Sequence, residues 1–149
     1  MSGETLAINK AEESNLEAIF ALLELVNLPT GGVKENINTF FILQEIDGTI
    51  KGCIGLELYN EYALLRSAAI HPENQGQGLG SKLTAAVTLL AKELGVRKLY
   101  LITETAKEFF ERKGFTLVSK DEIPESVKGS VEFTFRCAEK GVTMIRELE

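Results

Sequence analysis

A glycine-rich turn is the segment of this sequence whose residue types and spacing most clearly suggest chemistry. It runs from Gln75 to Ser81 as Gln-Gly-Gln-Gly-Leu-Gly-Ser and precedes a stretch with helical periodicity. Glycines let main-chain N–H groups come close to a ligand, and the start of the following helix adds the positive end of its dipole. The turn therefore predicts an anion site suited to a pyrophosphate.

Two common phosphate-binding motifs do not fit these residues. A P-loop requires Gly-Lys-Ser/Thr, whereas Gly80 is followed by Ser81 and Lys82. The dinucleotide fingerprint requires a third glycine where Ser81 stands, and it follows the first strand of a βαβ unit. ATP and NAD are therefore disfavoured, while a glycine-rich helix entry without any ligand stays open as an alternative.

The elements around the turn are predicted from hydrophobic periodicity and turn residues. Ser14 can cap a helix whose apolar face contains Leu16, Ile19, Phe20 and Leu23. Asp47-Gly48 is typical of a hairpin turn. The predicted strands are 5–9, 39–46, 50–57, 63–70, 98–103, 115–119 and 142–148, the later helices are 79–94 and 106–113, and 124–136 is ambiguous. This order predicts an α+β fold, a mixed and mostly antiparallel sheet with helices on both faces, over one domain of residues 1–149.

The composition of the chain disfavours nucleic acid, a metal ion and a membrane as its binding partners. The chain has 149 residues, 44% of them hydrophobic, and a formal net charge of −6. This charge and the scattered Lys and Arg make nucleic acid an unfavourable partner. One histidine, His71, and two cysteines, Cys53 and Cys137, do not form a metal-ligand pattern, and both thiols are expected to be reduced. The sequence lacks an apolar run of about 18 residues, so we expect no membrane span and a cytoplasmic protein.

Two motifs together resemble the GNAT superfamily of N-acetyltransferases. Gln75–Gly80 matches that family's Gln/Arg-x-x-Gly-x-Gly/Ala, and 106–115 resembles its Ala-x-x-x-Tyr-x-x-x-Gly-Phe helix, with Phe110 in place of the tyrosine. Within the superfamily, the chain looks like the acetyltransferase domain of N-acetylglutamate synthases and the acetyltransferases of arsenic-resistance operons. The resemblance implies acetyl-CoA as cofactor, a small and amino-acid-like amine acceptor, and a possible homodimer. The alternatives are a non-catalytic acetyl-CoA-binding regulatory module and a protein or peptide N-acetyltransferase.

The resemblance also implies which residues meet the cofactor. Main-chain groups of the turn would hold the pyrophosphate, and the end of the preceding strand would pair with the pantetheine arm. The N–H near Ile70 would stabilise the oxyanion. The implied cofactor residues are Ala68, Ala69, Ile70, Gln75, Gly76, Gln77, Gly78, Leu79, Gly80, Ser81, Thr103, Phe109 and Phe110.

Two charged residues are candidates for binding and activating the acceptor. Glu57, at the end of a predicted strand, is the candidate general base, and its alternative is a solvated residue beside a turn. Arg66 lies in an apolar strand, where a guanidinium needs an anionic partner, either the acceptor's carboxylate or a residue such as Glu57. Because Phe110 has no hydroxyl, the thiolate leaves without an acid or takes a proton from Ser67, Thr105 or water.

Overall fold

The computed structural model describes residues 6–130 and 141–148, which form two compact units. Unit 1 comprises residues up to Leu56 together with Ser67–Leu90, and unit 2 comprises Glu57–Arg66 together with the chain from Ala91 onward. The hydrogen-bonded strand order is β1-β2-β3-β4-β5-β7-β6, and the pairing of β4 with β5 is parallel. The predicted α+β class with a mixed, mostly antiparallel sheet is confirmed.

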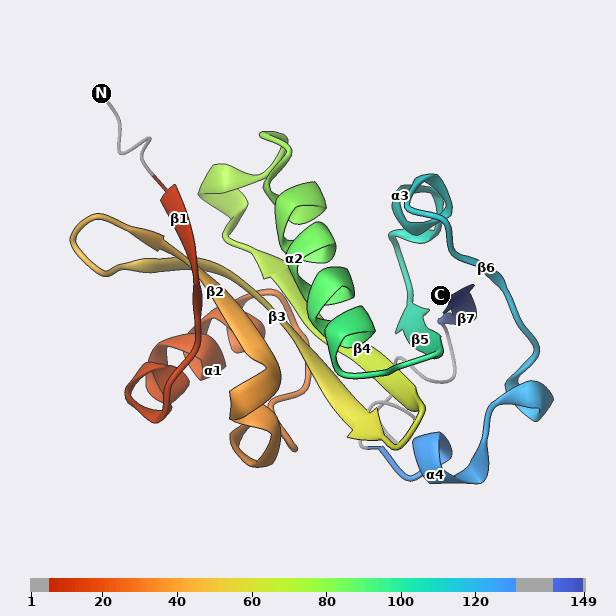
Figure 1. The fold of residues 1–149 in the computed structure, drawn as a ribbon. Helices are drawn as coiled ribbons and strands as arrows, with labels where there is room; N and C mark the ends of the chain where they lie inside the picture. The colour runs from red at the N-terminus through yellow and green to blue at the C-terminus, as the bar shows by residue number, and fades with distance from the viewer. Residues whose placement is uncertain (1–5, 131–140, 149) are drawn as a thin grey trace. The chain divides into compact units, whose positions relative to one another are not determined.

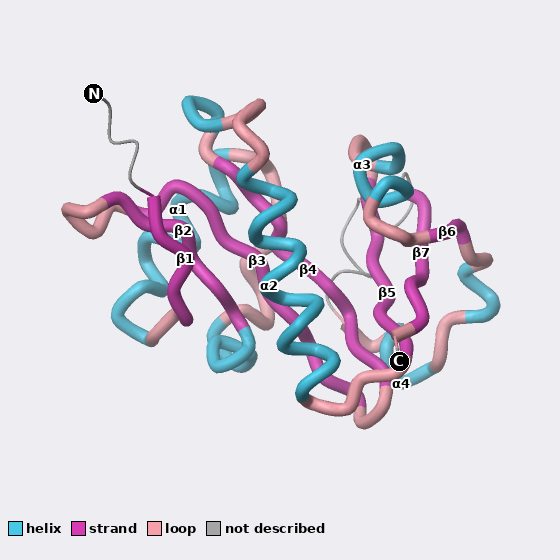
Figure 2. Tube along the Cα trace, turned by 45° about the horizontal axis from the view of Figure 1, so that its top comes forward, coloured by secondary structure: helices cyan, strands magenta, loops and turns pink. Residues whose placement is uncertain are grey.

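Unit 1 contains an antiparallel meander and two helices. Its elements are β1 (Leu6–Lys10), α1 (Leu16–Leu25), β2 (Phe40–Glu45), the first part of β3 (Ile50–Tyr59), the end of β4 (Tyr62–Ile70) and most of α2 (Leu79–Glu93). Figures 1 and 2 show α1 and α2 on opposite faces of these strands. Ile19 and Leu23 of α1 pack on Phe40, Ile42 and Cys53, so the helix periodicity seen in the sequence is the periodicity of this core.

Unit 2 contains the remaining strands and two short helices. β5 (Lys98–Thr103) pairs antiparallel with β7 (Val142–Glu147), and β6 (Thr116–Leu117) pairs with the other edge of β7. α3 (Lys107–Arg112) and α4 (Glu125–Lys128) complete the unit. Its core joins Leu64 and Tyr100 to Ile123 and Val127. In the parts of the chain that the structure describes, no helix is long and apolar enough to span a membrane.

Several predicted boundaries are wrong. Ser14 lies inside a 3-10 turn and does not cap α1. The N-cap residue of α1 is Asn15, whose side chain accepts from the Glu12 N–H and makes no capping bond to the helix. β3 continues to Tyr59, so that the turn into β4 is Asn60-Glu61 and Glu57 is in the body of a strand. The predicted strand 115–119 shortens to Thr116–Leu117.

Other predictions agree closely or lie outside the described residues. The strand 98–103 is β5, and the hairpin turn at Asp47-Gly48 joins β2 to β3. Thr5, residues 131–136 and Cys137 lie outside the described residues.

Candidate functional site

The glycine turn in unit 1 exposes main chain at the start of α2. Gly76 and Gly78 have φ of 83° and 78°, a left-handed conformation that residues with a Cβ adopt at a cost. A Cβ built at either position meets no heavy atom within 4 Å, so packing is not what requires glycine here. The backbone conformation requires it, and the main chain of the turn is left uncovered by its own side chains.

The residues before the turn fix where it starts. The His71 N–H donates to the Lys51 carbonyl at 2.7 Å, and the His71 ring accepts from the Glu73 N–H at 3.1 Å. Gln75 reaches back to donate to the Ile70 carbonyl at 3.1 Å. His71 is therefore the N-cap residue of the 3-10 turn Pro72–Asn74.

An ion pair joins β3 to the segment between β4 and α2. The Lys51 ammonium lies 3.1 Å from the Glu73 carboxylate, and this hydrogen bond and charge hold the pKa of Glu73 below its usual range. Because Glu73 is well exposed, the pair is screened by solvent and contributes little to stability. Its effect is to keep the loop entry next to β3.

The end of β4 combines an irregular backbone with one exposed residue. Ser67 has φ of 59°, an uncommon conformation for a residue with a side chain, and its carbonyl accepts from the Cys53 thiol. Ala69 is buried in the core of unit 1, while Ala68 is exposed. The predicted cofactor strand Ala68–Ile70 thus presents one small side chain to solvent.

Gly52 lets this strand lie close to β3. A Cβ at Gly52 would lie 3.0 Å from the Ile70 side chain and 3.2 Å from the Ala69 carbonyl. Gly52 therefore supports the predicted cofactor strand, a role that was not predicted from the sequence. A glycine inside an otherwise apolar strand is the signal that could have identified it.

The parallel ladder between β4 and β5 is short. Its paired residues run from Tyr62 with Lys98 to Leu64 with Tyr100, and no register pair continues to Arg66. β5 in contrast stays paired with β7 over its whole length.

Unit 2 contains a buried ion pair between the two predicted charged residues. Arg66 Nη1 donates to Glu57 Oε2 at 2.6 Å, and the whole residues are 1% and 5% exposed. A buried guanidinium needs such a partner, because its desolvation is otherwise uncompensated. Pairing with Glu57 was one of the two roles predicted for Arg66. The solvated alternative for Glu57 is wrong, because the residue is buried within β3.

Tyr59 contacts the second oxygen of the same carboxylate. Its hydroxyl donates to Glu57 Oε1, and Ser130 hydrogen-bonds to the hydroxyl in turn. Burial first, and then the hydrogen bond to Glu57 and its charge, raise the pKa of Tyr59 above its usual range. The predicted strand 50–57 ended before Tyr59, so the role of this residue was not predicted. In β3 its spacing of two from Glu57 puts both on one face of the strand.

The remaining predicted residues lie around α3. The Thr103 hydroxyl accepts from the Ala106 N–H at 3.0 Å and so shapes the entry to α3. The Phe110 ring is buried and meets Phe109 and Phe115 edge to face, at centroid distances of 5.0 and 5.5 Å. Phe110 is thus a packing residue of unit 2.

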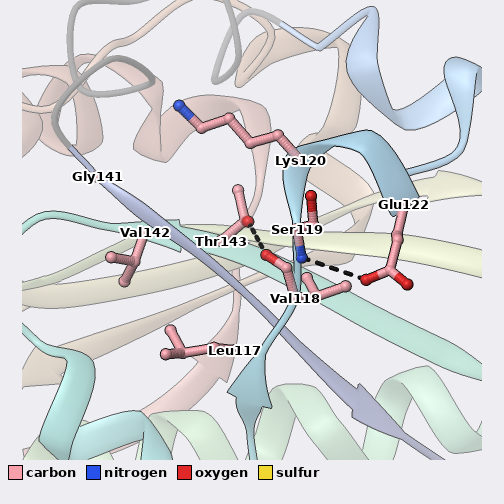
Figure 3. A pocket seen from close by; sticks show the side chains of 8 residues that line it. All are labelled: Leu117, Val118, Ser119, Lys120, Glu122, Gly141, Val142 and Thr143. Carbon is pink, nitrogen blue, oxygen red and sulfur yellow. Dashed lines mark hydrogen bonds between the residues drawn. The ribbon is translucent and has the colours of Figure 1, made fainter.

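An open depression of about 400 Å³ lies elsewhere in unit 2 (Figure 3). Thr143 donates to the Val118 carbonyl across it, and the Ser119 N–H donates to Glu122 at 3.3 Å. Its lining residues are Leu117, Val118, Ser119, Lys120, Glu122, Gly141, Val142 and Thr143. This lining contains none of the predicted site residues, so the candidate site is not placed there.

The relatives of this chain include amino-acid acetyltransferases. An amino-acid acetyltransferase of Aeromonas salmonicida is 31% identical over 127 residues, covering 77% of this chain and 28% of that protein. One from Neisseria meningitidis is 27% identical over 130 residues, covering 81% of this chain and 30% of that protein. The chain therefore spans about 30% of the length of these curated relatives.

Solved structures share the fold. N-acetylglutamate synthase from Neisseria gonorrhoeae, complexed with coenzyme A and N-acetyl-glutamate, superposes with a TM-score of 0.80 at 24% identity, covering 97% of this chain and 35% of that one. A Mycobacterium tuberculosis protein in complex with CoA gives a TM-score of 0.81 at 19% identity, covering 96% and 99%. The family model described as the acetyltransferase (GNAT) domain matches residues 36–117. Since this match spans more than half of the sequence, the chain belongs to the GNAT acetyltransferase family.

Proposed function

We propose that this chain moves the acetyl group of acetyl-CoA to the amine of a small, amino-acid-like acceptor. The observation that carries the proposal is the exposed turn before α2, where Gly76 and Gly78 have positive φ and open space around the position of a Cβ. The main-chain N–H groups at such a helix start suit an anion. Membership of the GNAT family makes acetyl-CoA the co-substrate. The acceptor class is supported by the names of relatives, which are amino-acid acetyltransferases.

The cofactor contacts are proposed at the predicted residues. Main-chain groups of Gln75–Ser81 hold the pyrophosphate, and the exposed position Ala68 with its neighbours Ala69 and Ile70 pairs with the pantetheine arm. Small side chains suit this role because they leave the strand's backbone accessible.

The reaction we propose is direct attack of the acceptor's amine on the thioester. The amine nitrogen bonds to the carbonyl carbon, the carbon–sulfur bond breaks, and the sulfur leaves as a thiolate. Glu57 takes the proton of the amine, directly or through water, and the Ile70 N–H stabilises the oxyanion. Among the described residues, each Glu57 oxygen has one hydrogen-bond partner, which leaves it a lone pair for this proton.

The burial of Arg66 supports a role as the partner of Glu57. Its guanidinium is paired with the Glu57 carboxylate at 2.6 Å, and its side chain is 0% exposed. Direct binding of the acceptor's carboxylate by Arg66 stays a prediction, tested by whether acceptors without a carboxylate react equally well.

Thiol release from acetyl-CoA, followed against a panel of acceptors, tests the proposal. We expect release with one or more amino acids, and none with the same amino acids acetylated at nitrogen. Release only with a peptide that lacks acidic groups indicates a peptide acetyltransferase. Binding of acetyl-CoA in calorimetry without release for any acceptor indicates a regulatory module.

A further inference from the structure

The carboxylate of Glu57 is held from two directions. Arg66 binds Oε2 at 2.6 Å from β4, while the Tyr59 hydroxyl binds Oε1 from the same strand as Glu57. An ion pair with Arg66 alone leaves the terminal torsion of a glutamate broadly free. The second hydrogen bond, on the other oxygen, removes this freedom and fixes the plane of the carboxylate.

Tyr59 is well suited to act as a permanent donor. Its ring packs at the edge of the core of unit 2, and the raised pKa keeps its hydroxyl protonated at neutral pH. Ser130, itself 4% exposed, hydrogen-bonds to the same hydroxyl. A hydroxyl that receives one hydrogen bond while donating another is polarised toward stronger donation.

We propose that Tyr59 is a positioning residue, which orients the Glu57 carboxylate toward the acceptor's amine. The inference rests on the proposed role of Glu57 as the proton acceptor. Tyr59 itself does not exchange a proton with the substrate. Its hydroxyl stabilises the ionised carboxylate, because a hydrogen bond donated to a charged oxygen favours the charged form.

The test is the pH profile of kcat/KM, measured by thiol release, for Tyr59→Phe against Tyr62→Phe. The acid limb of this profile reports protonation of the essential base in the free enzyme. Removing the hydroxyl makes protonation of Glu57 easier, so that the limb of Tyr59→Phe moves to higher pH by about one unit. At high pH, where Glu57 is ionised again, the rate approaches that of the wild type.

Tyr62→Phe is the matched control. Tyr62 lies on the neighbouring strand, packs in the same core and meets the Tyr100 ring edge to face at 6.2 Å. The change removes the same atom from the same kind of residue, and we expect its acid limb to coincide with that of the wild type. A shift of equal size in both variants overturns the proposal, because the effect is then a general one of losing a core hydroxyl.

Other outcomes separate Tyr59 from Glu57. If Glu57→Gln loses turnover but the limb of folded Tyr59→Phe does not move, the role of Tyr59 is overturned and that of Glu57 stands. If Glu57→Gln keeps normal turnover, the role of Glu57 is overturned, and that of Tyr59 with it. Should Tyr59→Phe fail to fold, Ser130→Ala decides: a smaller shift in the same direction supports the proposal, and an unmoved limb overturns it.

Discussion

The glycine turn of unit 1 is built from exposed main chain, whereas the Glu57 network of unit 2, made of Glu57, Tyr59 and Arg66, is built from buried or half-buried side chains. The turn is exposed and depends on backbone angles that Gly76 and Gly78 supply. The network depends on side-chain atoms that are hidden from water, Arg66 and Glu57 above all. The turn is therefore sensitive to an added side chain, whereas the network is sensitive to the removal of one.

The largest effect is expected from adding a carboxylate to the turn. In Gly78→Glu the new charge lies close to the bound pyrophosphate, and repulsion of about 4 kcal/mol at contact distance corresponds to about a 1000-fold loss of affinity. Calorimetry with coenzyme A measures it. Gly48→Glu is the control, because Gly48 also has positive φ and open space but lies in the hairpin turn. Equal losses in both variants would refute the assignment of the turn.

A change of one atom in the network is expected to reduce turnover. Glu57→Gln removes the proton acceptor but keeps the shape of the side chain, and we expect turnover to fall by at least about 100-fold. Coenzyme A affinity should stay unchanged, since the turn is separate in the chain and built of main-chain groups. Glu61→Gln, at the exposed turn after β3, is the matched control. Normal turnover in Glu57→Gln would remove this residue from the mechanism.

Stability distinguishes a buried ion pair from an exposed one. Arg66→Ala leaves the Glu57 carboxylate buried without its cation, and we expect the free energy of unfolding to fall by about 3–5 kcal/mol in urea titrations. Lys51→Ala breaks the pair with the exposed Glu73, and we expect it to leave the free energy of unfolding almost unchanged. Similar losses in both variants would show that burial does not set the strength of these pairs.

The smallest effect concerns alkaline pH. Because the pKa of Tyr59 is raised on folding, its neutral form stabilises the native state below about pH 10, and this stabilisation is lost as the pH rises toward the folded-state pKa. Urea midpoints at pH 9 and pH 11 should therefore fall more in the wild type than in Tyr59→Phe. Identical falls would place Tyr59 in an environment like that of water.

The sequence predicted the glycine turn more completely than it predicted the Glu57 network. The GNAT family, the order of elements and the exact limits of β5 were predicted, because periodicity and two spaced motifs are local signals. The end of β3 and the partner of Arg66 were not fixed in this way. A strand's end depends on pairing with its neighbour, and the Arg66–Glu57 contact joins residues nine positions apart through the register of two strands.

By itself the sequence determined the turn, since positive φ at Gly76 and Gly78 is a property of those residues and of the helix that follows them. Only the tertiary structure decided that Glu57, Tyr59 and Arg66 share one buried carboxylate. The physical reason is the range of the interactions. Backbone conformation is set within a few residues, whereas the burial of a charge depends on everything that packs around it.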